Sequence, residues 1–505
     1  MAVALAAAGC GSRVTAAQVQ AYRAQFQGSG SSGGAALSQG GPAAGGSTAA
    51  SSPLGGSSSG STPGGSGHAG ASSNSGASGS GTAVGGGSTA TSVAGSTATS
   101  LATSGATGGG GNSQLYAEGM EVDPAICKGT ASGPGIKATE IDVGNVSTIT
   151  GPVPGLSAGA AHGATAFAAY LNSVGGICGR RLVVKTADDD LDASQNSTAT
   201  QSLVGSSFAM VGSDSGVDQG GAPALKSSDI PDIGEALSPQ RFDLPNNFSP
   251  QPIPPTGYGP GPYVYLAHKY PQAVTHMAIL ALNQPTAIAE TQAMQHVMEA
   301  SGWKFIYSDF SIEPTQTDFS ADAQAMKSKG VQGVVILAVP TYYADVARAV
   351  QNAGMHMVLP NYAENAYDPS FIADAGSAAN GTILAAFYAM YDGEDASSVP
   401  LVSTFDRWYE GAYNTRPDEF AVDGWLSGML FVEGLNRGGG LTRADLLKGL
   451  SQVTSFDGGG LEGTANPAGK TPPQCYLIVD VVNGKFVRDP VDPRTGLDCQ
   501  YAGGS

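Results

Sequence analysis

Residues 141–221 alternate between strand-like and helical segments, and this alternation restricts the fold more than any other feature. A β-branched run at 141–148 is followed by an Ala-rich segment whose large apolar residues recur at i, i+3, i+4 and i+7. Two further apolar runs, 182–186 and 208–211, each end in polar residues. Strand, helix and strand with short connections predict a parallel sheet. Ligands of such sheets bind beyond the carboxyl ends of the strands, so these polar loops are the first place to expect a site.

A second block of the same kind follows a stretch rich in proline, glycine and aromatic residues. This stretch, 243–262, should interrupt regular structure, and we place a lobe boundary there. From 274 to 359 strand-like and helical segments alternate again, and the apolar run 331–339 is typical of a strand buried on both faces. Near the end of the chain, Asn483-Gly484 between two short apolar runs predicts a hairpin.

The predicted fold class is α/β, with two doubly wound Rossmann-like lobes joined by a hinge and a ligand cleft between them. We expect a truncated signal peptide with a lipobox at 1–10, a disordered linker at 11–112 and a two-lobed domain at 113–505. The first lobe is expected at about 135–257 with later C-terminal segments, and the second at about 263–390 with part of 400–415.

The N-terminal linker is predicted from composition. Residues 28–111 are almost entirely Gly, Ser, Ala and Thr, so they cannot bury enough apolar surface to offset the entropy of ordering. A flexible chain of about 80 such residues spans on the order of 50 Å. This length suits a domain held away from a surface.

The charge of the chain excludes several partners. The formal net charge is −18 with only 23 Lys and Arg residues, so we expect no nucleic-acid partner and no polybasic contact with anionic lipid. No apolar run reaches the ~18 residues that suggest a membrane span.

Five cysteines suggest export. Cys10 closes a short run of small apolar residues that resembles the lipobox of a bacterial lipoprotein, in which the cysteine carries lipid; an accidental cysteine in an Ala-rich leader is the alternative. Four cysteines then remain, an even number that suits an oxidising compartment. Of the three pairings they allow, Cys127–Cys178 and Cys475–Cys499 are favoured because each closes a short loop.

Several short motifs agree in order and spacing with one family. They are Thr150-Gly151-Pro152, Tyr170-Leu171-Asn172, Gly175-Gly176-Ile177-Cys178-Gly179-Arg180, Asp188-Asp189, Gly212-Ser213 and Pro231-Asp232-Ile233. This ordered set, behind a lipobox-like cysteine and a linker, resembles the type I periplasmic binding proteins, in particular the branched-chain amino acid (Leu/Ile/Val-binding) branch of ABC-transporter substrate-binding lipoproteins. The resemblance covers about 370 residues.

The resemblance also implies ligand-binding residues. In the first lobe these are Ser213 and Ser215, which would bind a carboxylate, and Ala236, Leu237 and Ser238, which would form a second contact. Across the cleft, Tyr342 or Tyr343 would cover the ligand, and Glu364 would meet an ammonium group. Asp214 departs from the pattern, because it would repel an anionic ligand if it pointed inward.

Other readings of these residues remain open. The residues at 213–215 could cap the following helix, Tyr342 and Tyr343 could only pack, and Glu364 could be solvated. Asp188-Asp189-Asp190 lacks the alternating spacing of a metal loop, so we expect no metal and no cofactor. The sequence of 212–216 has Asp where a nucleophile elbow needs Ser, and the histidines form no metal-binding pair, so we expect no enzyme.

The resemblance therefore implies an extracytoplasmic solute-binding protein of an ABC importer. It would bind a small polar ligand, such as an amino acid or amide, by hinge closure, and present it to an ABC permease and ATPase complex. We expect a monomer anchored by lipid to the outer face of the bacterial cell membrane. A ligand sensor of the same fold that signals to a membrane partner, and a tethered structural or adhesive wall protein, are the alternatives.

Overall fold

The computed structural model describes residues 118–255, 257–490 and 496–501. The predicted lipidation of Cys10 and the predicted linker at 11–112 fall outside these ranges. Among the helices described, none is long and apolar enough to cross a membrane. The fold below is that of the predicted two-lobed domain.

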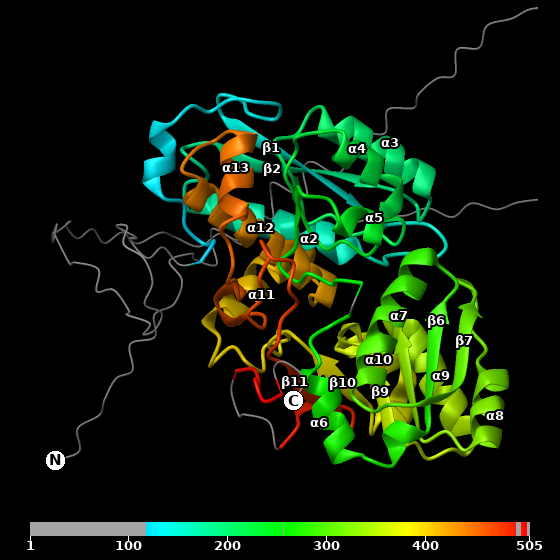
Figure 1. Ribbon diagram of the computed structural model, residues 1–505. Coiled ribbons are helices and arrows are strands. Elements are labelled where there is room, and N and C mark those ends of the chain that lie inside the picture. The colour runs from blue at the N-terminus through cyan, green and yellow to red at the C-terminus, as the bar shows by residue number, and fades with distance from the viewer. Residues whose placement is uncertain (1–117, 256, 491–495, 502–505) are drawn as a thin grey trace, which may run out of the picture. The chain divides into compact units, whose positions relative to one another are not determined.

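The first sheet has five strands, all paired in parallel, in the order β2-β1-β3-β4-β5 (Figure 1). After a short 3-10 helix at Pro124–Lys128, its strands and connecting helices are β1 (Glu140–Ser147), α2 (Ala158–Ser173), β2 (Arg181–Asp188), α3 (Ala193–Val204), β3 (Met210–Val211), α4 (Ala222–Lys226), β4 (Asp232–Ile233), α5 (Pro239–Phe242) and β5 (Asn247–Phe248). Helices cover both faces: Val143 of β1 shares an apolar cluster with Phe167 of α2, and Val146 shares another with Leu225 of α4. The strand-helix alternation that the sequence predicts is confirmed.

The second sheet has seven strands in the order β12-β11-β10-β9-β8-β6-β7. Its helices and strands are α6 (Gly261–Lys269), β6 (Met277–Leu282), α7 (Pro285–Ala300), β7 (Phe305–Ile312), α8 (Ser320–Lys329), β8 (Gly333–Leu337), α9 (Pro340–Asn352), β9 (Leu359–Tyr362), α10 (Pro369–Ala375), β10 (Ile383–Ala386), β11 (Leu477–Val481) and β12 (Phe486–Arg488). The strands from β6 to β10 pair in parallel, and β11 and β12 add an antiparallel edge.

Strand β6 shows why this sheet is covered on both faces. All six of its residues are buried. Leu280 lies in the same apolar cluster as Tyr343 of α9, whereas its neighbour Ile279 lies in the cluster that holds Met298 of α7. Alternate side chains thus point into two different cores, as a continuous apolar strand requires.

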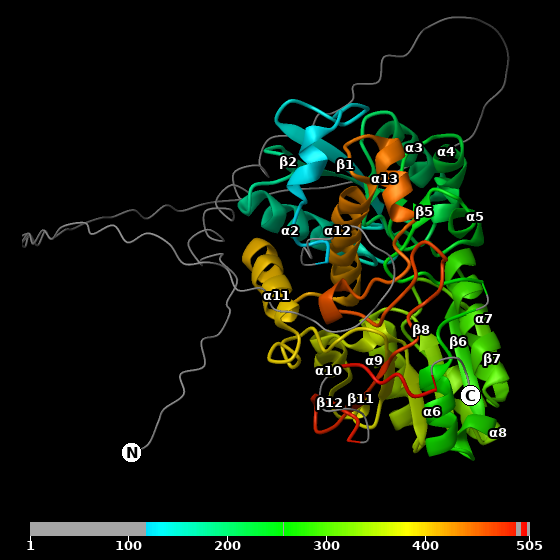
Figure 2. The same cartoon turned by 60° about the vertical axis from the view of Figure 1, so that its left-hand side comes forward.

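After β10 the chain returns to the first sheet. Helices α11 (Pro400–Tyr413), α12 (Glu419–Gly438) and α13 (Arg443–Leu450) lie beside the elements of that sheet in Figures 1 and 2. The sequence assigns part of 400–415 to the second lobe, but α11 packs on α2, with the Trp408 ring 6.1 Å from the Tyr170 ring. The two lobes are therefore joined by three segments, 249–260, 387–399 and 451–476.

Glycines let α2 and α12 lie in direct backbone contact. A Cβ atom placed on Gly163 would lie 1.9 Å from the carbonyl oxygen of Ala421, and one on Gly424 would lie 2.0 Å from that of Ala160. Both distances are below van der Waals contact, so only glycine fits at these two positions. This close approach fixes the position of the first turns of α12, which carry Glu419, Phe420 and Asp423.

Local sequence signals near the termini of the domain are confirmed. The favoured disulfides Cys127–Cys178 and Cys475–Cys499 are both formed. Strands β11 and β12 pair antiparallel around Asn483-Gly484, whose φ values of 52° and 70° suit a tight hairpin turn.

Candidate functional site

A cavity lies where the carboxyl ends of the parallel strands of both sheets meet. From the first sheet it is lined by the loops after β1, β2, β3 and β4, and from the second by the ends of β6, β8, β9 and β10 and by α7. It holds about 1020 Å³ of empty space, the solvent at its mouth included. Its position is the one expected for ligands of open α/β sheets.

Most of the wall is apolar. Aliphatic and aromatic side chains come from both lobes: Val153, Leu156, Leu191, Leu237, Tyr258, Tyr263, Leu282, Met294, Leu337, Tyr362, Phe387 and Phe420. A ligand with a hydrocarbon body would bury that body against these groups.

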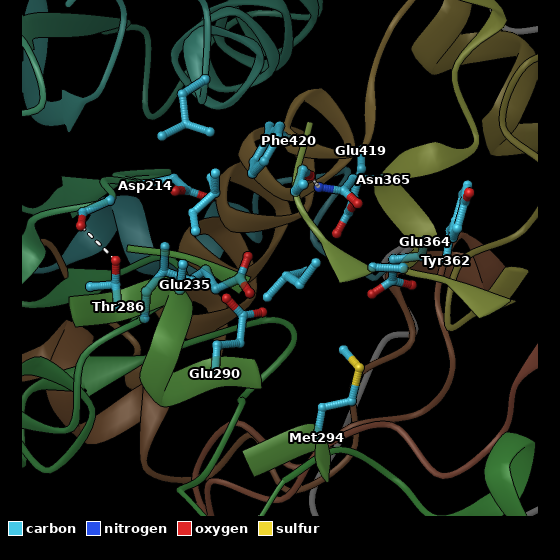
Figure 3. Close-up of a pocket in the computed structure, with 18 of the residues that line it drawn as sticks. Asp214, Glu235, Thr286, Glu290, Met294, Tyr362, Glu364, Asn365, Glu419 and Phe420 are labelled. Carbon is cyan, nitrogen blue, oxygen red and sulfur yellow. Dashed lines mark hydrogen bonds between the residues drawn. The ribbon is translucent and has the colours of Figure 1, made fainter. Parts of the chain in front are cut away.

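The polar part of the wall is acidic. Five carboxyl groups line the cavity, and they belong to Asp214, Glu235, Glu290, Glu364 and Glu419. Of the described residues that line it, none is Lys, Arg or His. Figure 3 shows the carboxyl ends of Glu235 and Glu290 turned toward each other, with Glu364 and Glu419 on the other side of the view. The cavity thus has apolar walls and a polar part made largely of acidic side chains.

Three carboxyl groups form a tight cluster at the first lobe. Oxygen atoms of Asp214, Glu235 and Asp423 all lie within 4.8 Å of one another. Asp423 accepts a hydrogen bond from the hydroxyl of Tyr388. Asp214 is only 2% exposed, and its Oδ2 receives no hydrogen bond from the described residues.

Burial, followed by repulsion between like charges, raises the pKa of these acids. Burial is the largest cause for Asp214 and Glu235, whose pKa values lie well above the usual range, and the charge of Asp423 comes next. The pKa of Asp423 itself rises to about 7 through burial. On the second lobe, burial raises the pKa of Glu290 to about 7, while the hydroxyl of Tyr258 opposes this by donating to Glu290.

Glu364 lies between the cavity and the segments that join the lobes. Its Oε1 accepts a hydrogen bond from Nε2 of Gln251 at 2.9 Å, and its Oε2 accepts one from the backbone N–H of Phe387 at 2.7 Å. Gln251 and Phe387 belong to two different joining segments. Burial raises the pKa of Glu364 to about 8, against the effect of these two bonds. Glu364 therefore lines the cavity and is hydrogen-bonded to two of the segments that join the lobes.

Arg241 holds the two loops that carry Asp214 and Glu235. Its guanidinium donates to both oxygens of Asp232 at 2.9 Å, and to the carbonyl oxygens of Ser213 at 3.1 Å and Glu235 at 2.6 Å. Arg241 is 2% exposed and does not line the cavity. Arg241 therefore holds the two loops in position without lining the cavity itself.

One hydrogen bond joins the lobes across the cavity. The hydroxyl of Thr286, in the first turn of α7, donates to the carbonyl oxygen of Gly216, in the loop after β3, at 2.6 Å (Figure 3). Both residues line the cavity. The structure therefore shows the lobes in contact at the cavity.

The structure brings two of the sequence-predicted ligand residues, Leu237 and Glu364, to the cavity wall. The others do not line it: Ser213, Ser215, Ala236, Ser238, Tyr342 and Tyr343. The alternative for Ser213 and Ser215, capping of the following helix, is not seen at the next two helices, which have no side-chain cap hydrogen bond. Ser213 Oγ accepts from the N–H of Val146, and Ser238 Oγ caps α5 by accepting from the N–H of Arg241. Ligand contact by these six residues stays a prediction.

The two tyrosines hold loops of the second lobe. The hydroxyl of Tyr342 donates to the carbonyl of Pro314, and that of Tyr343 donates to the side-chain oxygen of Asn365. Their rings pack against other aromatic rings rather than line the cavity.

Sequence reasoning missed four acids, Glu235, Glu290, Glu419 and Asp423. Glu235 could have been found, because it follows the short strand at Asp232–Ile233 by two residues, at the carboxyl end of a parallel strand. Glu290 lies inside a helix, and Glu419 and Asp423 lie on a helix that returns to the first lobe late in the chain. No local pattern marks these three.

The protein is expected to lose stability as the pH rises from about 5 to about 8. The pKa of Glu290 rises on folding from its usual 4.5 to about 7, and that of Glu364 to about 8. Each folded carboxyl group holds its proton more tightly than the unfolded chain does. Its stabilising effect is present below about pH 4.5 and is lost as the pH rises through about 7 or 8.

Thermal melts across this pH range check the expectation. Glu290→Gln keeps an acceptor for Tyr258 and removes one titrating group, so its Tm should decline less steeply than that of the wild type. Glu299→Gln, an exposed change on the same helix α7, is the matched control. A decline for Glu290→Gln as steep as that of the control would contradict the assignment.

Comparison with known proteins agrees with this geometry. A family described as periplasmic binding protein matches residues 140–485. A fatty acid ABC transporter substrate-binding protein from Thermomonospora curvata has a TM-score of 0.61 at 18% identity, covering 72% of this chain and 94% of that chain. A branched chain amino acid ABC transporter from Thermus thermophilus with bound valine has a TM-score of 0.58 at 17% identity, covering 72% of this chain and 97% of that chain.

The branched-chain amino acid transporter substrate binding protein of Streptococcus pneumoniae, in complex with isoleucine, gives a TM-score of 0.57 at 16% identity, covering 70% of this chain and 100% of that chain. A search of curated proteins found no match. At these identities the solved structures establish the fold, and the family match covers more than two thirds of the 505 residues. The chain therefore belongs to the periplasmic binding protein family and has the two-lobed type I fold that its sequence predicts.

Proposed function

We propose that the protein is an extracytoplasmic solute-binding protein of an ABC importer, which binds a small polar ligand such as an amino acid or amide between its lobes. The observation that carries the proposal is the cavity at the carboxyl ends of both sheets, with walls from both lobes. The family match supports it, and the similar structures named above are described as ABC transporter components.

Binding would act on the hinge. A ligand that touches Asp214 and Glu235 on one lobe and Glu290 and Glu364 on the other gains all of these contacts only when the lobes are closed. It therefore stabilises the closed state by its differential affinity for the two states. The closed form, with the Thr286–Gly216 bond made, is the form that an ABC permease and its ATPase would receive. The binding step itself needs no cofactor and no chemistry.

Two further features belong to the same proposal. A lipid on Cys10 and the linker at 11–112 would hold the domain near a permease on the outer face of the cell membrane. The domain would act as a monomer, since both walls of the cavity come from one chain.

A metabolite panel tests the proposal. The full chain is melted with amino acids, amides, amines, organic acids and fatty acids, each in large excess. A ligand bound only by the native state at about 100 times its Kd adds about 2.7 kcal/mol of stability, so its Tm rises by several degrees. Scattering measurements on any hit should show a more compact particle. A panel that moves no melting temperature would contradict solute binding and favour a structural role.

A further inference from the structure

Among the described residues, no cation forms an ion pair with the carboxyl groups that line the cavity. Arg241 is the cation that acts on Asp214, but all of its contacts are made with Asp232, with the 3.8 Å ion pair to Asp218 and with two backbone carbonyls. None of the described residues that line the cavity carries a positive charge. Buried carboxylates are costly unless they are paired, so a ligand that enters here is favoured if it supplies the charge.

Asp214 points to such a ligand independently of the cluster. Its side chain lines the cavity, it is 2% exposed, and its Oδ2 accepts no hydrogen bond from the described protein. Buried polar atoms are nearly always paired, so an unpaired one at a cavity wall marks the place of a donor. An ammonium group has three donors and no acceptor, which suits a surrounding of carboxylate oxygens.

Three polar side chains that could bind a carboxylate are already engaged within the protein. The hydroxyl of Ser215, which the family resemblance assigns to carboxylate binding, is engaged with Asp189 and accepts from Asn196 at 3.0 Å. On the second lobe, the amide of Asn361 donates to the carbonyl of Ile383 at 3.2 Å, and that of Asn365 donates to the carbonyl of Ala338. An α-carboxylate would thus meet acidic side chains and would find these three donors engaged.

A single divalent ion would account for fewer of the residues that line the cavity than an amine with a hydrocarbon chain would. Calcium takes six or more oxygen ligands and magnesium an octahedron of them, whereas the cluster supplies three carboxylates. An ion would also leave the aliphatic and aromatic walls and the more distant Glu364 and Glu419 without a role. A hydrocarbon chain with cationic groups would use both.

Resting on the proposed function, we propose that the ligand is an aliphatic amine with at least two ammonium groups and no carboxylate. One ammonium group lies among Asp214, Glu235 and Asp423, a second reaches the acids on the other side of the cavity, and the methylene chain packs on the apolar wall. Glu290 closes over the chain from the second lobe.

Calorimetric titration of the full chain tests this. The probes are the α,ω-diamines from 1,3-diaminopropane to 1,6-diaminohexane, with butylamine, 1,4-butanediol, leucine, leucinamide and calcium and magnesium chloride as comparisons, at about pH 8. At least one diamine is expected to bind about tenfold or more tightly than butylamine. Butylamine has only one ammonium group, so it lacks the charge-assisted hydrogen bonds that the second ammonium group of a diamine makes. The diol and leucine should bind at least about tenfold more weakly than that diamine.

Variants locate the site. Asp214→Asn keeps the shape of the side chain and should lower the affinity for the tightest-binding diamine by about tenfold or more. Glu290→Gln tests the same site from the other lobe and serves if Asp214→Asn does not fold. The exposed control Glu299→Gln should stay within about twofold.

The results separate this inference from the proposed function. If leucine or leucinamide binds and the diamines do not, the inference is wrong and solute binding stands. Tight binding of calcium or magnesium that no diamine displaces also overturns it. Equal affinity for butylamine and the diamines overturns the need for a second ammonium group. If Asp214→Asn and Glu299→Gln weaken binding equally, the attraction is to the acidic surface and the assigned site is wrong.

Discussion

Replacing Arg241 with methionine is expected to lower the free energy of unfolding by about 3–5 kcal/mol. The guanidinium is 2% exposed and makes a two-pronged ion pair with Asp232, which is itself fully buried. Without it, Asp232 and Asp218 become uncompensated buried charges, and the carbonyls of Ser213 and Glu235 lose their donor. Methionine fills similar space but supplies none of these donors.

Urea unfolding of the variant measures the loss. Arg348→Met is the matched control, because Arg348 pairs with Asp345 on the surface with 43% of its side chain exposed; its change should stay within about 1 kcal/mol. Asp232→Asn combined with Arg241→Met should recover part of the loss, since the buried charge is then removed as well. A loss for Arg241→Met as small as that of the control would show that the arginine does not hold the two site loops.

The second large effect is expected at the contact between α2 and α12. Gly163→Ala and Gly424→Ala should each destabilise the protein by about 1–3 kcal/mol, although alanine is the better helix former by about 1 kcal/mol. The added Cβ would meet a backbone carbonyl at 1.9 or 2.0 Å, so the helices must move apart. Since α12 carries Glu419 and Asp423, ligand affinity should fall with stability.

Gly205→Ala provides the control for this pair. Gly205 has an ordinary φ of −77°, and a Cβ there would meet nothing within 4 Å. This variant should be neutral or slightly stabilised in thermal melts. If Gly163→Ala were stabilised to the same degree, helix propensity rather than the close backbone contact would decide at that position.

The layout of the fold could be predicted because its signals are local. The apolar run at 331–339 gave a strand that is buried on both faces, and Asn483-Gly484 gave the hairpin. Both disulfides followed from loop length once Cys10 was set aside. The strand and the hairpin depend on residues that lie close together in the chain, where periodicity and turn chemistry act.

The site was predicted only in part because its residues meet through tertiary packing. The family resemblance pointed to Leu237 and Glu364, and both line the cavity. Asp214, which departs from the family pattern, lines it as well. The serines at 213 and 215 follow the same strand, but their hydroxyls face the structural network of the first lobe. Which neighbour in a loop points inward depends on backbone dihedrals that a short polar motif does not determine.

The sequence assigns part of α11 to the second lobe, whereas tertiary packing puts this helix in the first. Helix α11 follows the second sheet in the chain, so sequence order favours that lobe. Its buried aromatic residues Phe405, Trp408 and Tyr409 instead complete a cluster with Tyr170 and Trp425. Packing partners more than 200 residues apart carry no signal in a single sequence.

The late return of α12 to α2 has a consequence for how the chain folds. The partner of Phe167 and Tyr170 is Trp425, so α2 keeps aromatic surface open to water until residues beyond 419 have joined it. Contacts of such long sequence separation form slowly, because a large loop must close before they stabilise anything. Strands β6 to β10, by contrast, come from one continuous segment and can pair without waiting for the rest. Until then the first lobe exposes apolar surface that favours aggregation, and a chain that ends before residue 419 lacks helix α12 altogether.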